Sequence, residues 1–129
     1  MDQVPYHVRF NYRGRELRVE LGGEHRHLDA LIETWRLIAA EVGRVQAQRL
    51  LVVSALWGNA PTLWDMRTFL ENMRGIGLEH CHTAVVVGGR FKTAQAELAE
   101  ILAHEFGFHV RVFEFEREAE IWLLHRGTD

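Results

Sequence analysis

The sequence has little of what disulfide-rich, secreted or membrane-spanning chains need. Its 129 residues include one cysteine, Cys81, and two prolines, so no internal disulfide can form. No stretch approaches the ~20 consecutive apolar residues of a membrane-spanning helix. The first residues show no basic flank followed by an apolar segment, as a secretory signal would. We therefore expect a cytoplasmic, non-secreted protein whose core needs no disulfide and no structural metal.

An excess of one charge is also missing. Fifteen Lys and Arg residues against 18 Asp and Glu residues give a formal net charge of −3, which provides no overall positive field for a phosphate backbone. Nucleic acid is therefore not an expected partner. No Ser-, Pro- or Gly-rich linker and no long run of like charge interrupts the chain. We predict a single domain over residues 1–129.

Hydrophobic residues follow two different periods along the chain. Alternation predicts half-buried strands, short continuous apolar runs predict buried strands, and spacings of three and four predict amphipathic helices. The predicted strands cover residues 6–12, 17–21, 50–53, 84–87 and 108–113. The predicted helices cover residues 28–42, 62–73, 94–106 and 116–125. Arg13-Gly14 permits a tight turn, so the first two strands are expected to form an antiparallel hairpin.

This order, ββαβαβαβα, predicts an α/β fold with a five-stranded mixed sheet and four helices. The first strand is expected to lie antiparallel at one edge, and the other strands are expected to be parallel because helices connect them. The expected inner sides of the last three helices are Leu63, Met66, Phe69, Leu70 and Met73; Ala94, Leu98, Ile101, Leu102 and Phe106; and Ala119, Trp122 and Leu123.

Several segments, in their order and spacing, resemble a bacterial family. They are residues 5–10, 17–19, 35–40, 49–53, 61–66, 84–87, 107–114 and 121–123. Together they resemble the sporulation-stage-II-protein-AA-like (SpoIIAA-like) proteins of the STAS (sulfate transporter and anti-sigma factor antagonist) superfamily. The resemblance implies a β-α superhelical fold and no catalytic activity. Relatives of this architecture include regulatory phosphoprotein switches and, more distantly, CRAL-TRIO lipid-transfer domains.

The phosphorylation motif of the switch proteins is absent. In those proteins, the strand corresponding to residues 50–53 leads to an Asp-Ser-Ser-Gly-like motif, and a hydroxyl of this motif is phosphorylated at a helix start. Here the hydroxyls in this region belong to Thr62, at the expected helix start, and to Ser54, at the strand end. The resemblance therefore supports the fold more than the switch.

Residues 54–64 form the candidate functional surface, because open α/β sheets bind ligands beyond the carboxyl ends of their strands. The following helix also offers free N–H groups and the positive end of its dipole. The candidate ligand- or partner-binding residues are Ser54, Trp57, Asn59, Thr62, Trp64 and Phe69. The alternative is structural: Thr62, with Asp65 three residues later, is simply a helix cap, and the tryptophans belong to the core.

The eight histidines suggest a metal site only at first sight. Glu24-His25-Arg26-His27 follows a predicted strand and Glu79-His80-Cys81-His82 precedes one, so parallel strands would place the two motifs at opposite ends of the sheet. We expect no metal and no cofactor. Cys81 is expected to be buried and structural, and the acidic run over residues 114–120 is expected to be a solvated helix start.

Two functions from different classes follow from these residues, and no nucleophile, base and orienting group can be placed together for catalysis. The first is a non-enzymatic domain that binds a small apolar or lipid-like ligand or a membrane surface, with the second and third helices as a cover. The alternative is a regulatory protein-interaction module of the anti-sigma factor antagonist type, switched by phosphorylation near Thr62. A homodimer that forms through the exposed edge of the first strand is a further alternative.

Overall fold

The computed structural model describes residues 6–25, 27–58, 62–87 and 93–126. These residues form five strands, four α-helices and one short 3-10 helix. The strands are β1 (Tyr6–Arg13), β2 (Glu16–His25), β3 (Arg49–Gly58), β4 (His82–Val86) and β5 (His109–Phe113). The helices are α1 (Leu28–Val45), α2 (Leu63–Met73), α3 (Thr93–Glu105) and α4 (Glu116–Arg126), with the 3-10 helix η1 (Leu78–His80) before β4. The predicted element order is confirmed.

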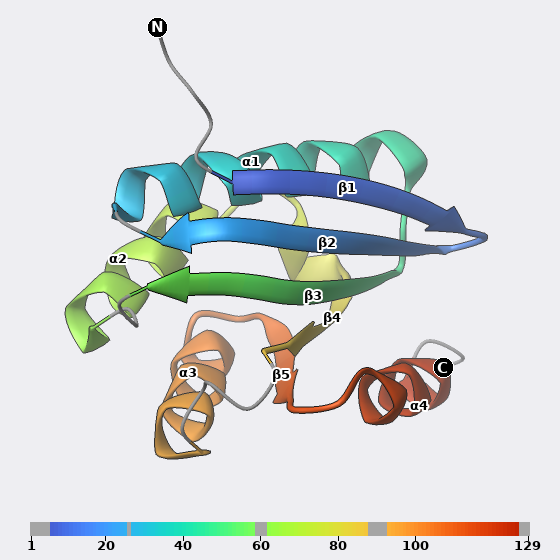
Figure 1. The fold of residues 1–129 in the computed structure, drawn as a ribbon. Coiled ribbons are helices and arrows are strands. Elements are labelled where there is room, and N and C mark those ends of the chain that lie inside the picture. Colours follow the sequence, from blue (N-terminus) through green and yellow to red (C-terminus); the bar gives the residue numbers. More distant parts are fainter. Residues whose placement is uncertain (1–5, 26, 59–61, 88–92, 127–129) are drawn as a thin grey trace, which may run out of the picture.

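The five strands form one mixed sheet in the order β1-β2-β3-β4-β5 (Figure 1). β1 pairs antiparallel with β2, and β2 to β5 pair in parallel. The predicted sheet, with its first strand antiparallel at an edge, is therefore confirmed. Strands that are neighbours in the sheet are also neighbours in the chain, and each parallel connection carries a helix.

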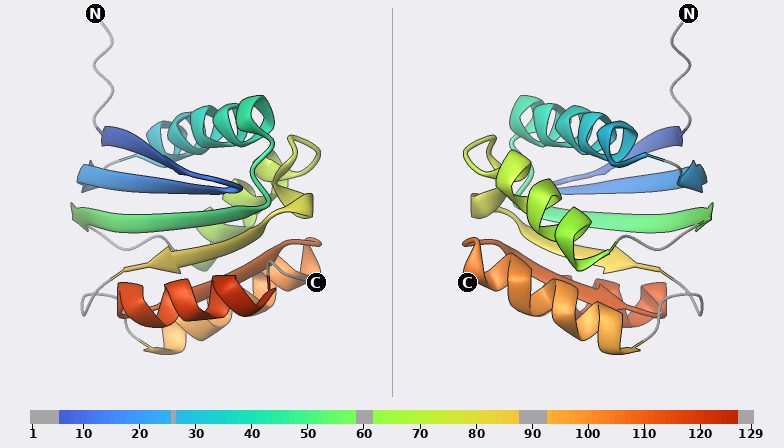
Figure 2. Two further views of the ribbon diagram at one scale, coloured as in Figure 1. Left: turned by 90° about the vertical axis from the view of Figure 1, so that its right-hand side faces the viewer. Right: turned by 90° about the vertical axis from the view of Figure 1, so that its left-hand side faces the viewer.

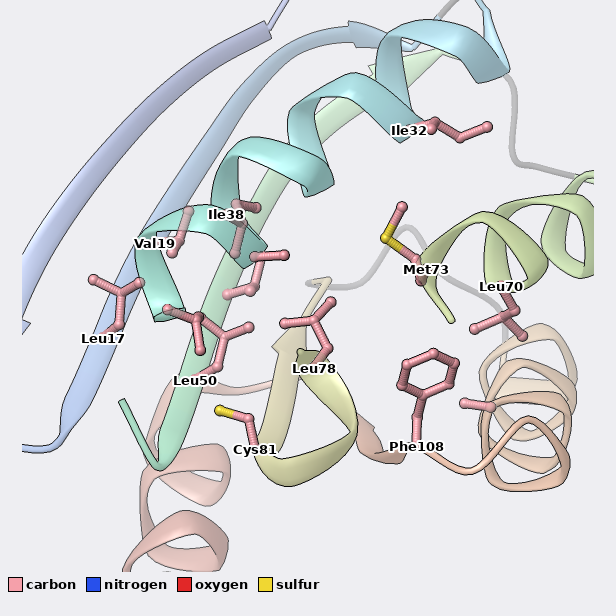
Figure 3. Close-up of a cluster of buried hydrophobic side chains, with 14 of the residues drawn as sticks. Leu17, Val19, Ile32, Ile38, Leu50, Leu70, Met73, Leu78, Cys81 and Phe108 are labelled. Carbon is pink, nitrogen blue, oxygen red and sulfur yellow. The ribbon is translucent and has the colours of Figure 1, made fainter. Parts of the chain in front are cut away.

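The helices cover the two faces of the sheet unequally (Figure 2). In β3, Leu50 and Val52 belong to a cluster that includes buried residues of α1, α2 and α3 (Figure 3). The intervening Leu51 points to the other face, where it packs with Ala119 and Leu123 of α4. Because neighbouring residues of a strand face opposite sides, α1, α2 and α3 lie on one face and α4 lies on the other.

β2 and β3 are longer than the sequence predicts. The pair Gly22-Gly23 was expected to end β2 near Leu21, but the strand continues to His25 in parallel register with β3, which itself runs to Gly58. Pairing with a neighbouring strand therefore overrides the low strand propensity of glycine. Gly23 has a φ of 121°, which a residue with a side chain rarely adopts. Trp57, beyond the predicted end of this strand at residue 53, accordingly belongs to β3.

Some predicted helix faces are wrong in detail. Leu63 of α2 and Leu98 and Ile101 of α3 are exposed, although they were expected on the inner sides. In α3, Leu102 is buried as predicted, and Ala103, which was not predicted on the inner side, is buried as well. α3 is the outermost helix of its layer and packs on β5 and α2 (Figure 1). The buried face of α3 is therefore narrower than the apolar face that the sequence pattern predicts.

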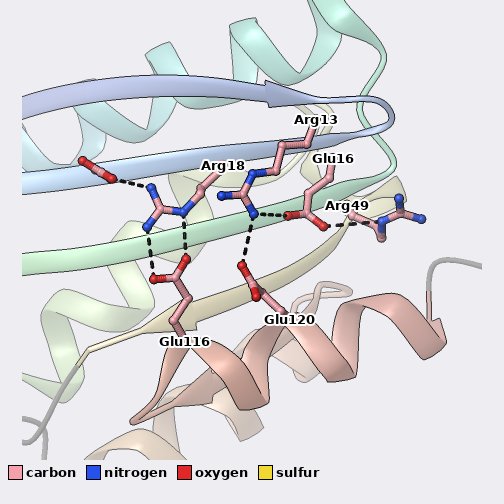
Figure 4. Close-up of polar contacts among 7 residues, drawn as sticks. Arg13, Glu16, Arg18, Arg49, Glu116 and Glu120 are labelled. Carbon is pink, nitrogen blue, oxygen red and sulfur yellow. Dashed lines mark hydrogen bonds and ion pairs between the residues drawn. The ribbon is translucent and has the colours of Figure 1, made fainter.

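α4 is also tied to the sheet by charged side chains (Figure 4). Arg18 of β2 donates two hydrogen bonds to the Glu116 carboxylate, with Nε–Oε2 and Nη2–Oε1 distances of 2.8 and 3.1 Å. Arg13 reaches Glu120 at 3.1 Å. The acidic start of α4 was expected to be solvated, so the role of Glu116 is a correction: its partner lies 98 positions away in the chain.

Candidate functional site

Thr62 and Asp65 fix the start of α2. The backbone N–H of Asp65 donates to Oγ1 of Thr62 at 3.0 Å, and the backbone N–H of Thr62 donates to Oδ2 of Asp65 at 3.3 Å. This reciprocal pair is the predicted capping box and satisfies two N–H groups at the helix start. The structural interpretation of Thr62 as a cap is therefore confirmed.

Replacing Thr62 by alanine is expected to lower the free energy of unfolding by about 1 kcal/mol. The change removes the acceptor for the N–H of Asp65, which lies at the exposed start of α2 and can turn to water. Chemical denaturation of the original protein and of Thr62→Ala measures the difference in the free energy of unfolding. Thr62→Ser keeps the hydroxyl and serves as the control, so an equal loss in both variants would contradict the capping role.

Trp64 and Leu63, the first two residues of α2, are solvent-exposed. Their exposed fractions are 75% and 48%. The alternative in which Trp64 belongs to the core is therefore wrong. Because the capping box holds the first turn of the helix, both side chains extend from an ordered backbone, and together they form an exposed apolar pair at the start of α2.

Phe69 lies elsewhere on α2. Its ring packs edge-on against Trp35 of α1, with the ring centroids 5.8 Å apart and the planes at 81°, and it is partly buried against the core. Trp64 and Phe69 are five positions apart, so they point about 140° away from each other around the helix axis. The structure therefore places Phe69 in the seam between α1 and α2, not beside Trp64.

The remaining candidate residues lie on β3 and after it. Ser54 is partly buried in β3, where its Oγ accepts a 3.5 Å hydrogen bond from the backbone N–H of Leu56. The backbone of Trp57 pairs with Glu24 of β2. Asn59 lies outside the described residues. Ser54 is therefore a strand residue, whereas Thr62 is at an exposed helix start.

The histidine motifs lie at opposite ends of the sheet, as expected: His25 is the last residue of β2, and His82 is the first residue of the parallel β4. Among the described residues, no group of three His, Cys, Asp or Glu side chains could hold a metal ion. Cys81 lies in the hydrophobic core, and burial raises the pKa of its thiol to about 12. Its thiolate is therefore not available as a nucleophile near neutral pH.

Sequence reasoning missed one arrangement of histidines. His82 begins β4 and His109 begins β5, and these two residues are register partners with ring centroids 5.3 Å apart. They are 27 positions apart in the chain, so no local motif contains both. The sequence offered one signal for this pair: His82 stands two residues before one predicted parallel strand, and His109 is the second residue of the next.

Neither protein-family models nor curated proteins give a match to this chain. Over the described part of the chain, no helix combines the length and the apolar character needed to cross a membrane.

Proposed function

We propose that this chain is a non-enzymatic, STAS-like binding domain that acts in the cytoplasm and associates with a lipid-like or membrane surface through the start of α2. The observation that carries the proposal is the exposed pair Leu63 and Trp64 on a capped helix start. Tryptophan suits such a surface, because its ring is largely apolar and its indole N–H can still bond to water or lipid headgroups. The strand order and the antiparallel first strand support the STAS-like part of the proposal.

A surface contact fits better than an enclosed ligand. Of the large apolar residues around α2, Met73 and Leu78 are buried in the hydrophobic core, and Met66 packs against it (Figure 3). These side chains are therefore already covered by the protein itself. Leu63 and Trp64 have no such cover and gain most from contact with an apolar surface.

Cosedimentation with phospholipid vesicles tests this proposal. Trp64→Ala is expected to weaken association with mixed phosphatidylcholine and phosphatidylglycerol vesicles about fivefold, because it removes a large part of the apolar contact. Leu124→Ala, on the exposed side of α4, is the matched control and should bind like the original protein. Equal binding by both variants, or no binding by the original protein, would rule out this surface.

A regulatory protein-interaction module is the second candidate, and the capping box favours it. Phosphorylation of Thr62 would add about −1.5 to −2 charges beside the Asp65 carboxylate, which accepts the backbone N–H of Thr62. The two negative groups would repel, and the start of α2 would rearrange. Ser54 suits this role less, since it is partly buried in β3.

Mass spectrometry of protein isolated from its own cells distinguishes the two candidates. Stoichiometric phosphate on Thr62, together with a protein partner whose binding Thr62→Glu alters, would favour the switch. Vesicle binding that depends on Trp64 and is indifferent to Thr62→Glu would favour the lipid surface.

A further inference from the structure

A surface cavity of about 340 Å³, open to solvent, lies at the β5 edge of the sheet near the starts of β4 and β5, and it is lined by α3 from one face and α4 from the other. Its lining residues are His82, Glu100, His104, His109, Val110, Arg111 and Trp122. It adjoins the amino ends of these parallel strands, whereas α2 begins beyond the carboxyl end of β3 (Figure 1). The cavity is therefore separate from the surface proposed above and does not depend on it.

One wall of the cavity is aromatic. The rings of His82 and His109 lie 5.3 Å apart at 37° to each other, and Trp122 of α4 meets His82 edge-on at 6.3 Å. Trp122 is held by a second ring, Phe113, at 5.8 Å. Rings arranged in this way offer flat surfaces and edges to a planar guest.

The polar lining favours a negatively charged guest. Arg111 carries a permanent positive charge on five N–H donors, and its guanidinium carbon lies 5.5 Å from the centre of the Phe113 ring. His82, His104 and His109 add imidazole groups that can donate hydrogen bonds.

Glu100 is the acidic residue of this lining, and one of its oxygens is already engaged. Its Oε2 accepts a 2.6 Å hydrogen bond from the backbone N–H of Val112 in β5. The carboxylate is thereby held against the edge of the sheet. Of the described residues of α4, only the uncharged Trp122 lines the cavity, so three histidines and Arg111 face a single carboxylate.

We propose that this cavity binds a small aromatic anion, a planar ring that carries one carboxylate or phosphate group. The ring would pack against Trp122 and the histidine pair, and the anionic group would accept hydrogen bonds from Arg111 and His104. The volume lies at the lower end of the range for small-molecule sites, which suits a single ring.

Isothermal titration calorimetry with benzoate and phenyl phosphate tests the proposal, and the two probes distinguish a carboxylate from a phosphate guest. At least one is expected to bind saturably, and cyclohexanecarboxylate, with the same charge and no flat ring, is expected to bind at least about fivefold more weakly.

Two exposed residues supply variants that leave the core intact. Arg111→Gln and His104→Gln are each expected to weaken the tighter-binding probe at least about fivefold. Arg117→Gln, an exposed arginine of α4 outside the lining, is the matched control and should change little. The absence of saturable binding by both aromatic probes, equal binding of cyclohexanecarboxylate, or unchanged binding by Arg111→Gln would overturn the proposal.

Discussion

Replacing Leu123 by alanine is expected to lower the free energy of unfolding by about 2–5 kcal/mol. Leu123 is fully buried, with an exposed fraction of 0%, and it packs with Leu51, Ala84 and Val86 between α4 and the sheet. The substitution removes most of an apolar side chain and leaves a cavity that its neighbours can only partly fill. Urea denaturation followed by circular dichroism measures the loss.

Leu124 provides a control one position further along the same helix. Its exposed fraction is 61%, so Leu124→Ala is expected to change the stability by less than about 0.5 kcal/mol. Helix propensity is nearly the same for both substitutions, and the comparison therefore isolates burial. Similar losses in the two variants would contradict the packing of α4 on this face of the sheet.

The Leu123→Ala substitution is also expected to affect the cavity between α3 and α4. Trp122 stands beside Leu123 on α4 and forms part of the aromatic wall. A looser α4 would let the Trp122 ring move away from His82 and Phe113. We therefore expect Leu123→Ala to weaken aromatic-anion binding as well, whereas Leu124→Ala should leave it unchanged.

The sequence patterns predict the architecture because each helix and strand has a local pattern of apolar spacing or a local cap. Spacings of three and four over residues 28–42 and the Thr62–Asp65 capping box both reappear in the structure. The ends of β2 and β3 were not predictable in this way. Their last residues pair with each other, and a local pattern around Gly22-Gly23 does not contain the partner strand.

The candidate site was predictable only in part. The position of α2 follows from the cap, but the exposure of Leu63 depends on which side of α2 meets α1 and the sheet. The cavity depends on the parallel register that brings His82 beside His109. Such contacts join residues from separate elements, and their geometry is fixed only when the sheet and helices assemble.

The acidic start of α4 shows the same limit for charged residues. A helix start rich in Glu is ordinarily explained by solvation and by the helix dipole. The Glu116 carboxylate instead accepts a hydrogen bond from Arg18 of β2, and Arg18 also donates a hydrogen bond to Glu20 on its own strand (Figure 4). The hydrogen bond from Arg18 lowers the pKa of Glu116. A charged residue therefore links the start of α4 to β2.

Arg18→Met is expected to lower the free energy of unfolding by about 1.5–2 kcal/mol near neutral pH. Methionine keeps much of the apolar length of the side chain and removes the two-point contact with Glu116. The Arg18 side chain has an exposed fraction of only 12%, so water replaces the lost contact poorly. Arg9→Met is the control: Arg9 is 80% exposed and 3.9 Å from Glu20, and exposed pairs of this kind contribute little.

The difference between the original protein and Arg18→Met is expected to shrink in acid. Arg18 lowers the pKa values of Glu116 and Glu20 below their ordinary value of 4.5, so the stability it confers is present above that pH and is lost as these carboxylates are protonated. Burial raises the pKa of Glu16, an effect of opposite sign that both proteins share and that largely cancels in the comparison. Urea denaturation from about pH 7 down to about pH 3 measures the difference. A gap that stays constant over this range would show that Arg18 stabilises the fold through packing alone, and not through its bond to the start of α4.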